Sequence, residues 1–100
     1  MEYTKEQLRE MFGKLPEEVR YAIASEDTSI ILQHIAKKYN LHIDQGGQLA
    51  QEATYVMLGI THPNQFVANI QNKLNLDTKT ANDIASEVNS GIFLPIRESL

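Results

Sequence analysis

The sequence predicts an all-α protein, a compact orthogonal bundle of five to six short helices around a central helix at about residues 43–58. Apolar residues recur at spacings of three and four along each long segment, which is the period of an amphipathic helix. Valine and isoleucine are scattered within these stripes and do not alternate as they would in strands. Short connections join the segments, so we expect one domain over residues 1–100.

The first two helices are predicted from their end signals. Thr4 and Gln7 have the residue types and spacing of a capping box, so a helix should begin after Thr4. Gly13 is expected to end this helix in a left-handed conformation. We expect residues 1–13 either to dock loosely on the bundle or to fray. Pro16 suits the first turn of the second helix.

A third helix is expected from about Thr28 to Tyr39, and its end has a pattern that occurs three times. In each case a residue that tolerates a left-handed conformation precedes an apolar residue, which is typical of a Schellman ending. The three pairs are Asn40 with Leu41, Gly59 with Ile60, and Asn75 with Leu76.

The central helix is predicted to have one apolar and one polar face. Its small and apolar face comprises Gly46, Leu49, Ala50, Ala53, Val56, Met57 and Ile60. Its polar face is expected to hold Asp44, Gln45, Gln48, Gln51, Glu52 and Tyr55. The small stripe Gly46, Ala50 and Ala53 would let another backbone approach closely, either at a helix crossing within the fold or as the seam of a homodimer.

The last helix should begin with a cap at Asp77 or Thr78 and then meet Pro95. A proline ring inside a helix clashes with the carbonyl group four residues earlier. Here that residue is Gly91, whose backbone adapts more easily than that of other residues. We therefore expect a kinked continuation to about Glu98.

Composition narrows the classes of function. The formal net charge is −4 at pH 7, and the nine lysine and arginine residues are scattered, which disfavours binding to a phosphate backbone. The chain has no cysteine, so it can have neither disulfides nor a cysteine-based zinc site. The N-terminus is polar, and no apolar run reaches the length of a membrane span. We expect a cytoplasmic protein that does not interact with membranes.

No arrangement of residues predicts catalysis. His42 and Asp44 flank the start of the central helix, but no third or fourth metal ligand follows at a defined spacing. His34 is expected on an outer face, and His62 before Pro63 suits a helix cap. The carboxylates lie at helix starts or on predicted polar faces. We therefore expect no metal, no cofactor, no catalytic residue and no small-molecule substrate.

The C-terminus holds the strongest candidate for a binding site. Its apolar residues lie partly off the stripe of the last helix, and exposed apolar area with a polar rim is typical of partner sites. The candidate partner-binding residues are Ile92, Phe93, Leu94, Ile96 and Arg97. The alternative is that the apolar side chains lock the tail onto the first two helices.

The last two helices also have the outline of a helix-turn-helix. The second of them would present Thr78, Lys79, Thr80 and Asn82 to a nucleic-acid groove. A single lysine between two aspartates, Asp77 and Asp83, is a poor phosphate-binding set.

Three stretches, 41–45, 58–64 and 95–100, resemble a small all-helical domain of uncultivated candidate-phyla bacteria for which no activity is known. The resemblance would cover about residues 15 to 100. It implies a compact helical fold and a bacterial cytoplasmic origin, and it implies no cofactor or catalytic residue.

The sequence thus predicts a non-enzymatic module that binds a protein partner or a second copy of itself. The alternative is a helix-turn-helix-like nucleic-acid-binding domain that uses the helix starting near Thr78.

Overall fold

The computed structural model describes residues 3–99, and it confirms the predicted all-α bundle. The helices are α1 (Lys5–Gly13), α2 (Glu17–Ala24), α3 (Glu26–Lys38), α4 (Ile43–Met57), α5 (Phe66–Lys73) and α6 (Thr78–Val88). A 3-10 turn, Pro63–Gln65, precedes α5. After α6 the chain continues as a π-helical turn, Asn89–Phe93, and a 3-10 helix, Leu94–Ser99.

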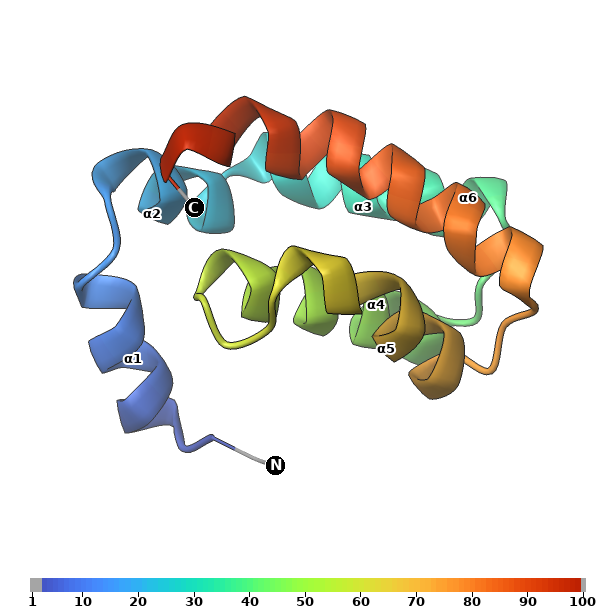
Figure 1. Ribbon diagram of the computed structural model, residues 1–100, viewed down its shortest axis with the longest axis horizontal. Helices are drawn as coiled ribbons and strands as arrows, with labels where there is room; N and C mark the ends of the chain where they lie inside the picture. The colour runs from blue at the N-terminus through green and yellow to red at the C-terminus, as the bar shows by residue number, and fades with distance from the viewer. Residues whose placement is uncertain (1–2, 100) are drawn as a thin grey trace.

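The helices form two layers (Figure 1). One layer holds α2, α3 and α6 with its continuation, and the other holds α4 and α5. The core lies between them, and its largest fully buried apolar side chains are Phe66, Ile35, Leu49, Met57, Ile70, Leu74 and Ile84. Within residues 3–99, no helix combines the length and the apolar composition that crossing a membrane would need.

Helix α1 stands apart from both layers (Figure 1). The predicted capping box at its start is present, because the Thr4 side chain accepts from the Gln7 N–H and the Gln7 side chain accepts from the Thr4 N–H. None of its residues is buried. The ring of Tyr3, just before the helix, meets Tyr55 of α4 edge to face, with 6.2 Å between centroids.

The three predicted Schellman endings are confirmed. Asn40, Gly59 and Asn75 have φ values of 54°, 83° and 55°. The amide that follows each of them donates to a carbonyl five residues earlier, at 2.9 Å for Leu41 and Ile60 and at 3.0 Å for Leu76. These endings depend only on neighbouring residues, which explains why the sequence predicts them.

The prediction for Gly13 is wrong. Gly59 is the glycine with a positive φ among the described residues, and α1 instead ends through Lys14 in the right-handed region. The Lys14 N–H donates to the carbonyls of Met11 and Phe12, so the last turn closes without a left-handed residue. The next apolar residue, Leu15, packs against the core.

The continuation past Pro95 is confirmed, and its geometry explains how the proline is accommodated. The Leu94 N–H donates to the carbonyl of Asn89, five residues back, which is the hydrogen bond of a π-helix. This wider turn immediately precedes Pro95, which has no N–H to donate. Gly91 lies close to α3, since a Cβ atom on it would be 3.3 Å from Cγ2 of Ile31.

Candidate interaction surface at the C-terminal segment

We call residues 89–99 the C-terminal segment, and three of its predicted partner-binding residues belong to the core. Ile92, Phe93 and Ile96 are buried. The Phe93 ring packs edge to face on Phe66 of α5, with 5.3 Å between ring centroids and 81° between ring planes. These three side chains therefore form no exposed apolar surface. They follow in part the alternative that the sequence left open, because Ile92 and Ile96 lie against α2, whereas Phe93 packs on α5.

Leu94 and Arg97 remain accessible, and both line a groove of about 820 Å³. We call it the Arg97 groove. It lies between the C-terminal segment and residues 59–63, and Leu94 is 44% exposed within it. The apolar part of its lining comprises Leu15, Val56, Met57, Ile60, Pro63, Phe93 and Leu94. Arg97, His62, Thr61, Gln65 and Asn89 supply polar groups, and no aspartate or glutamate of the described residues lines it.

A second groove, of about 650 Å³, lies on the other side of the C-terminal segment, against α2 and the start of α3. We call it the Glu17 groove. Its lining includes Pro16, Tyr21, Ala22, Ile31, Ile92, Pro95 and Ile96, and Tyr21 is 71% exposed. Its charged lining residues are Glu17, Glu18 and Asp27, with no lysine or arginine among the described residues. The two grooves therefore differ in charge.

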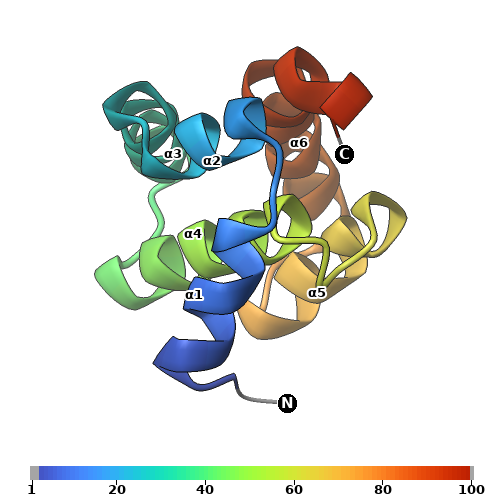
Figure 2. The ribbon, with the colours of Figure 1, turned by 90° about the vertical axis from the view of Figure 1, so that its left-hand side faces the viewer.

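Helical spacing explains how one short segment serves both grooves. Asn89, Phe93 and Arg97 are four residues apart and face the Arg97 groove. Ile92 and Ile96 are also four residues apart and face the Glu17 groove. Residues three or four apart share one face of a helix, so the segment presents two different sides. Figure 2 shows the segment with α2 on one side and the turn before α5 below it.

The small-residue stripe of α4 is used inside the fold. A Cβ atom on Gly46 would lie 3.7 Å from the Cβ atom of Ala36 in α3. Ala53 is fully buried, and Ala50 packs against the core. The stripe Gly46, Ala50 and Ala53 thus belongs to an internal helix crossing, which was one of its two predicted uses, and it does not offer an open seam to a second copy.

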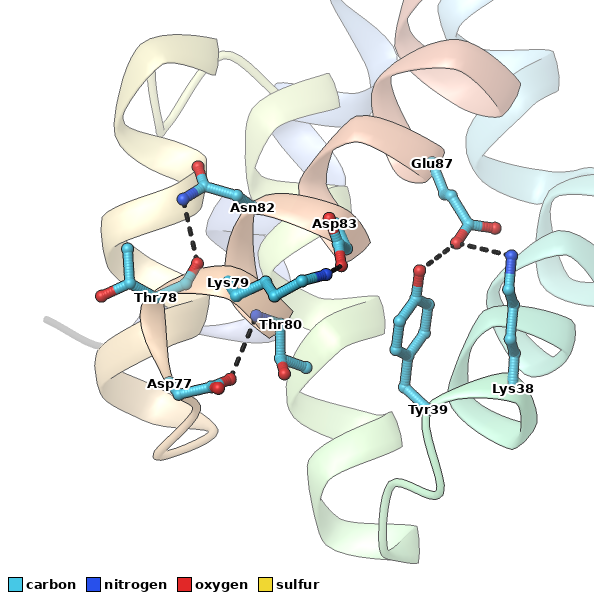
Figure 3. Close-up of polar contacts among 9 residues, drawn as sticks. All are labelled: Lys38, Tyr39, Asp77, Thr78, Lys79, Thr80, Asn82, Asp83 and Glu87. Carbon is cyan, nitrogen blue, oxygen red and sulfur yellow. Dashed lines mark hydrogen bonds and ion pairs between the residues drawn. The ribbon is translucent and has the colours of Figure 1, made fainter.

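The residues proposed for nucleic-acid reading lie at the start of α6, where local contacts hold them (Figure 3). The Asp77 side chain accepts from the Thr80 N–H at 3.0 Å, which confirms Asp77 as the cap. Lys79 Nζ lies 2.9 Å from Asp83 Oδ2. The Asn82 side chain donates to the carbonyl of Thr78 at 2.9 Å.

These contacts also set the charge of this helix end. Hydrogen bonds from Thr80 hold the pKa of Asp77 below its ordinary value, and the Asp83 carboxylate raises the pKa of Lys79. Both groups are therefore charged at neutral pH. One paired lysine between two carboxylates makes a weak attraction for a phosphate backbone.

A polar cluster that the sequence did not reveal joins the end of α3 to α6 (Figure 3). The Tyr39 hydroxyl donates to the Glu87 carboxylate, and Lys38 Nζ lies 3.1 Å from the same oxygen. The hydrogen bond to Glu87 raises the pKa of Tyr39 to about 12, helped by partial burial. Hydrogen bonds from Tyr39 and Lys38 lower the pKa of Glu87.

Glu52 is buried, so its predicted place on the polar face of α4 is wrong. Its side chain is 1% exposed, and its Oε2 lies 2.7 Å from Nζ of Lys73 in α5. The other oxygen, Oε1, is buried without a hydrogen-bond partner among the described residues. The spacing was a usable signal, because Glu52 lies three residues after Leu49 and four before Val56, on the buried stripe.

The histidines are placed at the surface. The Gln45 side chain accepts from the His42 N–H at 2.8 Å, and His62 Nδ1 accepts from the Asn64 N–H at 3.2 Å, so both residues mark helix starts. His34 is exposed on α3. Among the side chains that the structure describes, no three of the metal-binding types gather where they could share an ion.

No protein-family model, curated protein or solved structure matches this chain. The resemblance to a bacterial helical domain therefore stays an expectation from the sequence. The two grooves and the side chains that line them are the features of the structure that bear on function.

Proposed function

We propose that this protein is a non-enzymatic protein-interaction module that binds a partner segment in the Arg97 groove. The observation that carries the proposal is the groove's lining, in which Leu94 and Arg97 are accessible and no described acidic residue is present. The chain as a whole has a net charge of −4, so this groove differs from the rest of the molecule. It suits an amphipathic segment that carries apolar side chains and a carboxylate.

The apolar lining supplies most of the expected affinity. Fully burying a leucine contributes about 1.5–3 kcal/mol, so covering the exposed part of Leu94 would contribute roughly 1 kcal/mol. Several groove residues must be covered together for stable binding, because association itself has a large entropic cost. An ion pair with the exposed Arg97 adds little to the free energy of binding. It contributes to selecting a partner of opposite charge and to orienting it in the groove.

A selection from a library of displayed helical peptides tests the proposal without knowledge of the natural partner. We expect the selected peptides to combine apolar residues at spacings of three and four with an aspartate or glutamate. Leu94→Asp should abolish their binding. The matched control is Ile43→Asp, because Ile43 is 94% exposed and lines neither groove.

The proposal fails if Leu94→Asp and Ile43→Asp bind the selected peptides equally well. It also fails if no peptide of this type is enriched over the starting library. Circular dichroism of both variants establishes that a loss of binding does not reflect unfolding.

We place the protein in the cytoplasm, a location that the absence of cysteine supports. Nucleic-acid binding through Thr78, Lys79, Thr80 and Asn82 stays a prediction from the sequence. No contact at the start of α6 favours it, since Lys79 pairs with Asp83.

A further inference from the structure

We infer that the partner that fits the Arg97 groove is a second copy of this chain, whose Glu17 groove lies against it. This inference rests on the proposed function and names the partner for the same site. The protein then associates as a symmetric dimer, in which the C-terminal segments lie at the centre of the interface.

The charges of the two grooves are complementary. Arg97 lines one groove without a described acidic neighbour in that lining, whereas Glu17 and Asp27 line the other without a lysine or arginine. No ion pair involves Arg97 or Glu17 within the described part of the chain. Two grooves of opposite charge on one molecule attract each other between copies, whereas two grooves of the same charge repel each other.

An exposed apolar side chain accompanies each groove. Leu94 lines the Arg97 groove, and Tyr21 lines the Glu17 groove with 71% of its surface exposed. Each groove therefore offers both a recess and an accessible apolar side chain beside it. Tyrosine is also enriched at protein interfaces, since its ring covers apolar area while its hydroxyl stays hydrated.

The positions of the two grooves are compatible with two-fold symmetry. The grooves flank a single segment, with residues 59–63 bounding one and α2 bounding the other. A two-fold axis can lie between the two copies and run parallel to their C-terminal segments. A rotation of 180° about this axis reverses the side of the segment on which each groove lies. It places each Arg97 groove opposite the partner's Glu17 groove. The same contact then forms twice, and the assembly closes as a dimer.

Charge reversal tests this pairing sharply, because either variant alone places like charges at positions 97 and 17 in both contacts of the dimer. Arg97→Glu places an acidic side chain opposite the acidic Glu17 groove. Glu17→Lys places a basic side chain opposite Arg97, although Glu18 and Asp27 still line that groove. We expect each variant to weaken the dimer by about tenfold or more through repulsion between like charges. An equimolar mixture of the two variants should restore it, because residues 97 and 17 then carry opposite charges in both contacts of the mixed dimer.

The measurement is light scattering after gel filtration over a roughly hundredfold range of concentration. The wild-type mass should rise from the chain mass of 11.3 kDa toward twice that value. Two matched controls should leave association unchanged. Glu26→Lys reverses an acidic residue in the first turn of α3, and Lys37→Glu reverses an exposed basic residue in the last turn of the same helix.

The failure of this inference is distinguishable from that of the proposed function. A wild-type protein that stays monomeric throughout overturns the self-pairing, while peptide binding that depends on Leu94 would still support the groove as a site for another protein. A dimer that resists both charge reversals, or variants that stay apart when mixed, would overturn the pairing of the two grooves.

Discussion

Glu52 of α4 and Lys73 of α5 form an ion pair with 2.7 Å between Oε2 and Nζ, in which the carboxylate is 1% exposed and the lysine side chain 49%. The pair joins the two helices of one layer at the edge of the core. A buried carboxylate is tolerated only when its charge is compensated, so Lys73 allows Glu52 to occupy a position that the helical spacing assigns to an apolar residue.

Removing Lys73 alone should therefore destabilise the protein. For Lys73→Met we expect a loss of about 2–4 kcal/mol in the free energy of unfolding, less than for a fully enclosed pair because Lys73 is half exposed. Urea denaturation followed by circular dichroism measures it. Glu52→Met together with Lys73→Met should recover most of the loss, because no buried charge remains. Equal stability of Lys73→Met and wild type would contradict this account.

The cluster of Tyr39 and Glu87 predicts a shifted tyrosine titration. NMR of ring-labelled tyrosine should show Tyr39 titrating with a pKa of about 12, where the ordinary value is 10.0. In Glu87→Gln the pKa of Tyr39 should return toward the ordinary value, because the carboxylate hydrogen bond is its main cause. A Tyr39 titration identical in both proteins would show that this hydrogen bond does not form in solution.

The same cluster predicts how stability changes with pH. Because the pKa of Tyr39 is raised on folding, its contribution is complete below pH 10 and is lost as pH rises toward 12. The pKa of Glu87 is lowered, so its contribution is present above the ordinary value of 4.5 and is lost as pH falls through the folded value. At both low and high pH, the urea midpoint of unfolding should therefore fall less steeply with pH in Glu87→Gln than in wild type.

Two glycine substitutions should change stability in opposite directions. Gly59 has a φ of +83°, so Gly59→Ala forces a left-handed alanine and should cost about 1–2 kcal/mol. Gly47 lies inside α4, and a Cβ atom there would have no neighbour within 4 Å. Gly47→Ala should stabilise the protein by up to about 1 kcal/mol, because alanine is the better helix former. Thermal unfolding of the two variants checks both signs, and equal shifts would contradict the helix ending described here.

The weak attraction of this protein for phosphate groups predicts that a heparin column will not retain it. Because Lys79 pairs with Asp83 and the chain is acidic, we expect the protein to pass through a heparin column at low salt. Retention that weakens with salt and is lost in Lys79→Ala would contradict this expectation and favour the helix-turn-helix alternative.

The sequence predicted the features that neighbouring residues determine. The endings at Asn40, Gly59 and Asn75 and the cap at Asp77 each depend on a few adjacent groups, and all of them are present. Gly13 is the exception, because a left-handed glycine is one of several ways to end a helix, and α1 uses a right-handed residue instead.

The sequence could not predict pairs that the tertiary fold brings together. Tyr39 and Glu87 are 48 residues apart, and Glu52 and Lys73 are 21 apart, so nothing local marks them as partners. For a related reason the sequence left two uses of the C-terminal segment open, a partner site or packing onto the bundle. Phe93 packs on Phe66, while Leu94 and Arg97 line the Arg97 groove. The two grooves exist only because α2 and residues 59–63 flank that segment.

The most direct test of the groove account is the solution mass of Arg97→Glu and Glu17→Lys, measured separately and as an equimolar mixture. The account predicts monomers of 11.3 kDa for each variant alone and a mass approaching twice that value for the mixture. A mixture that stays monomeric at concentrations where the wild type is dimeric would contradict the pairing of the Arg97 groove with the Glu17 groove.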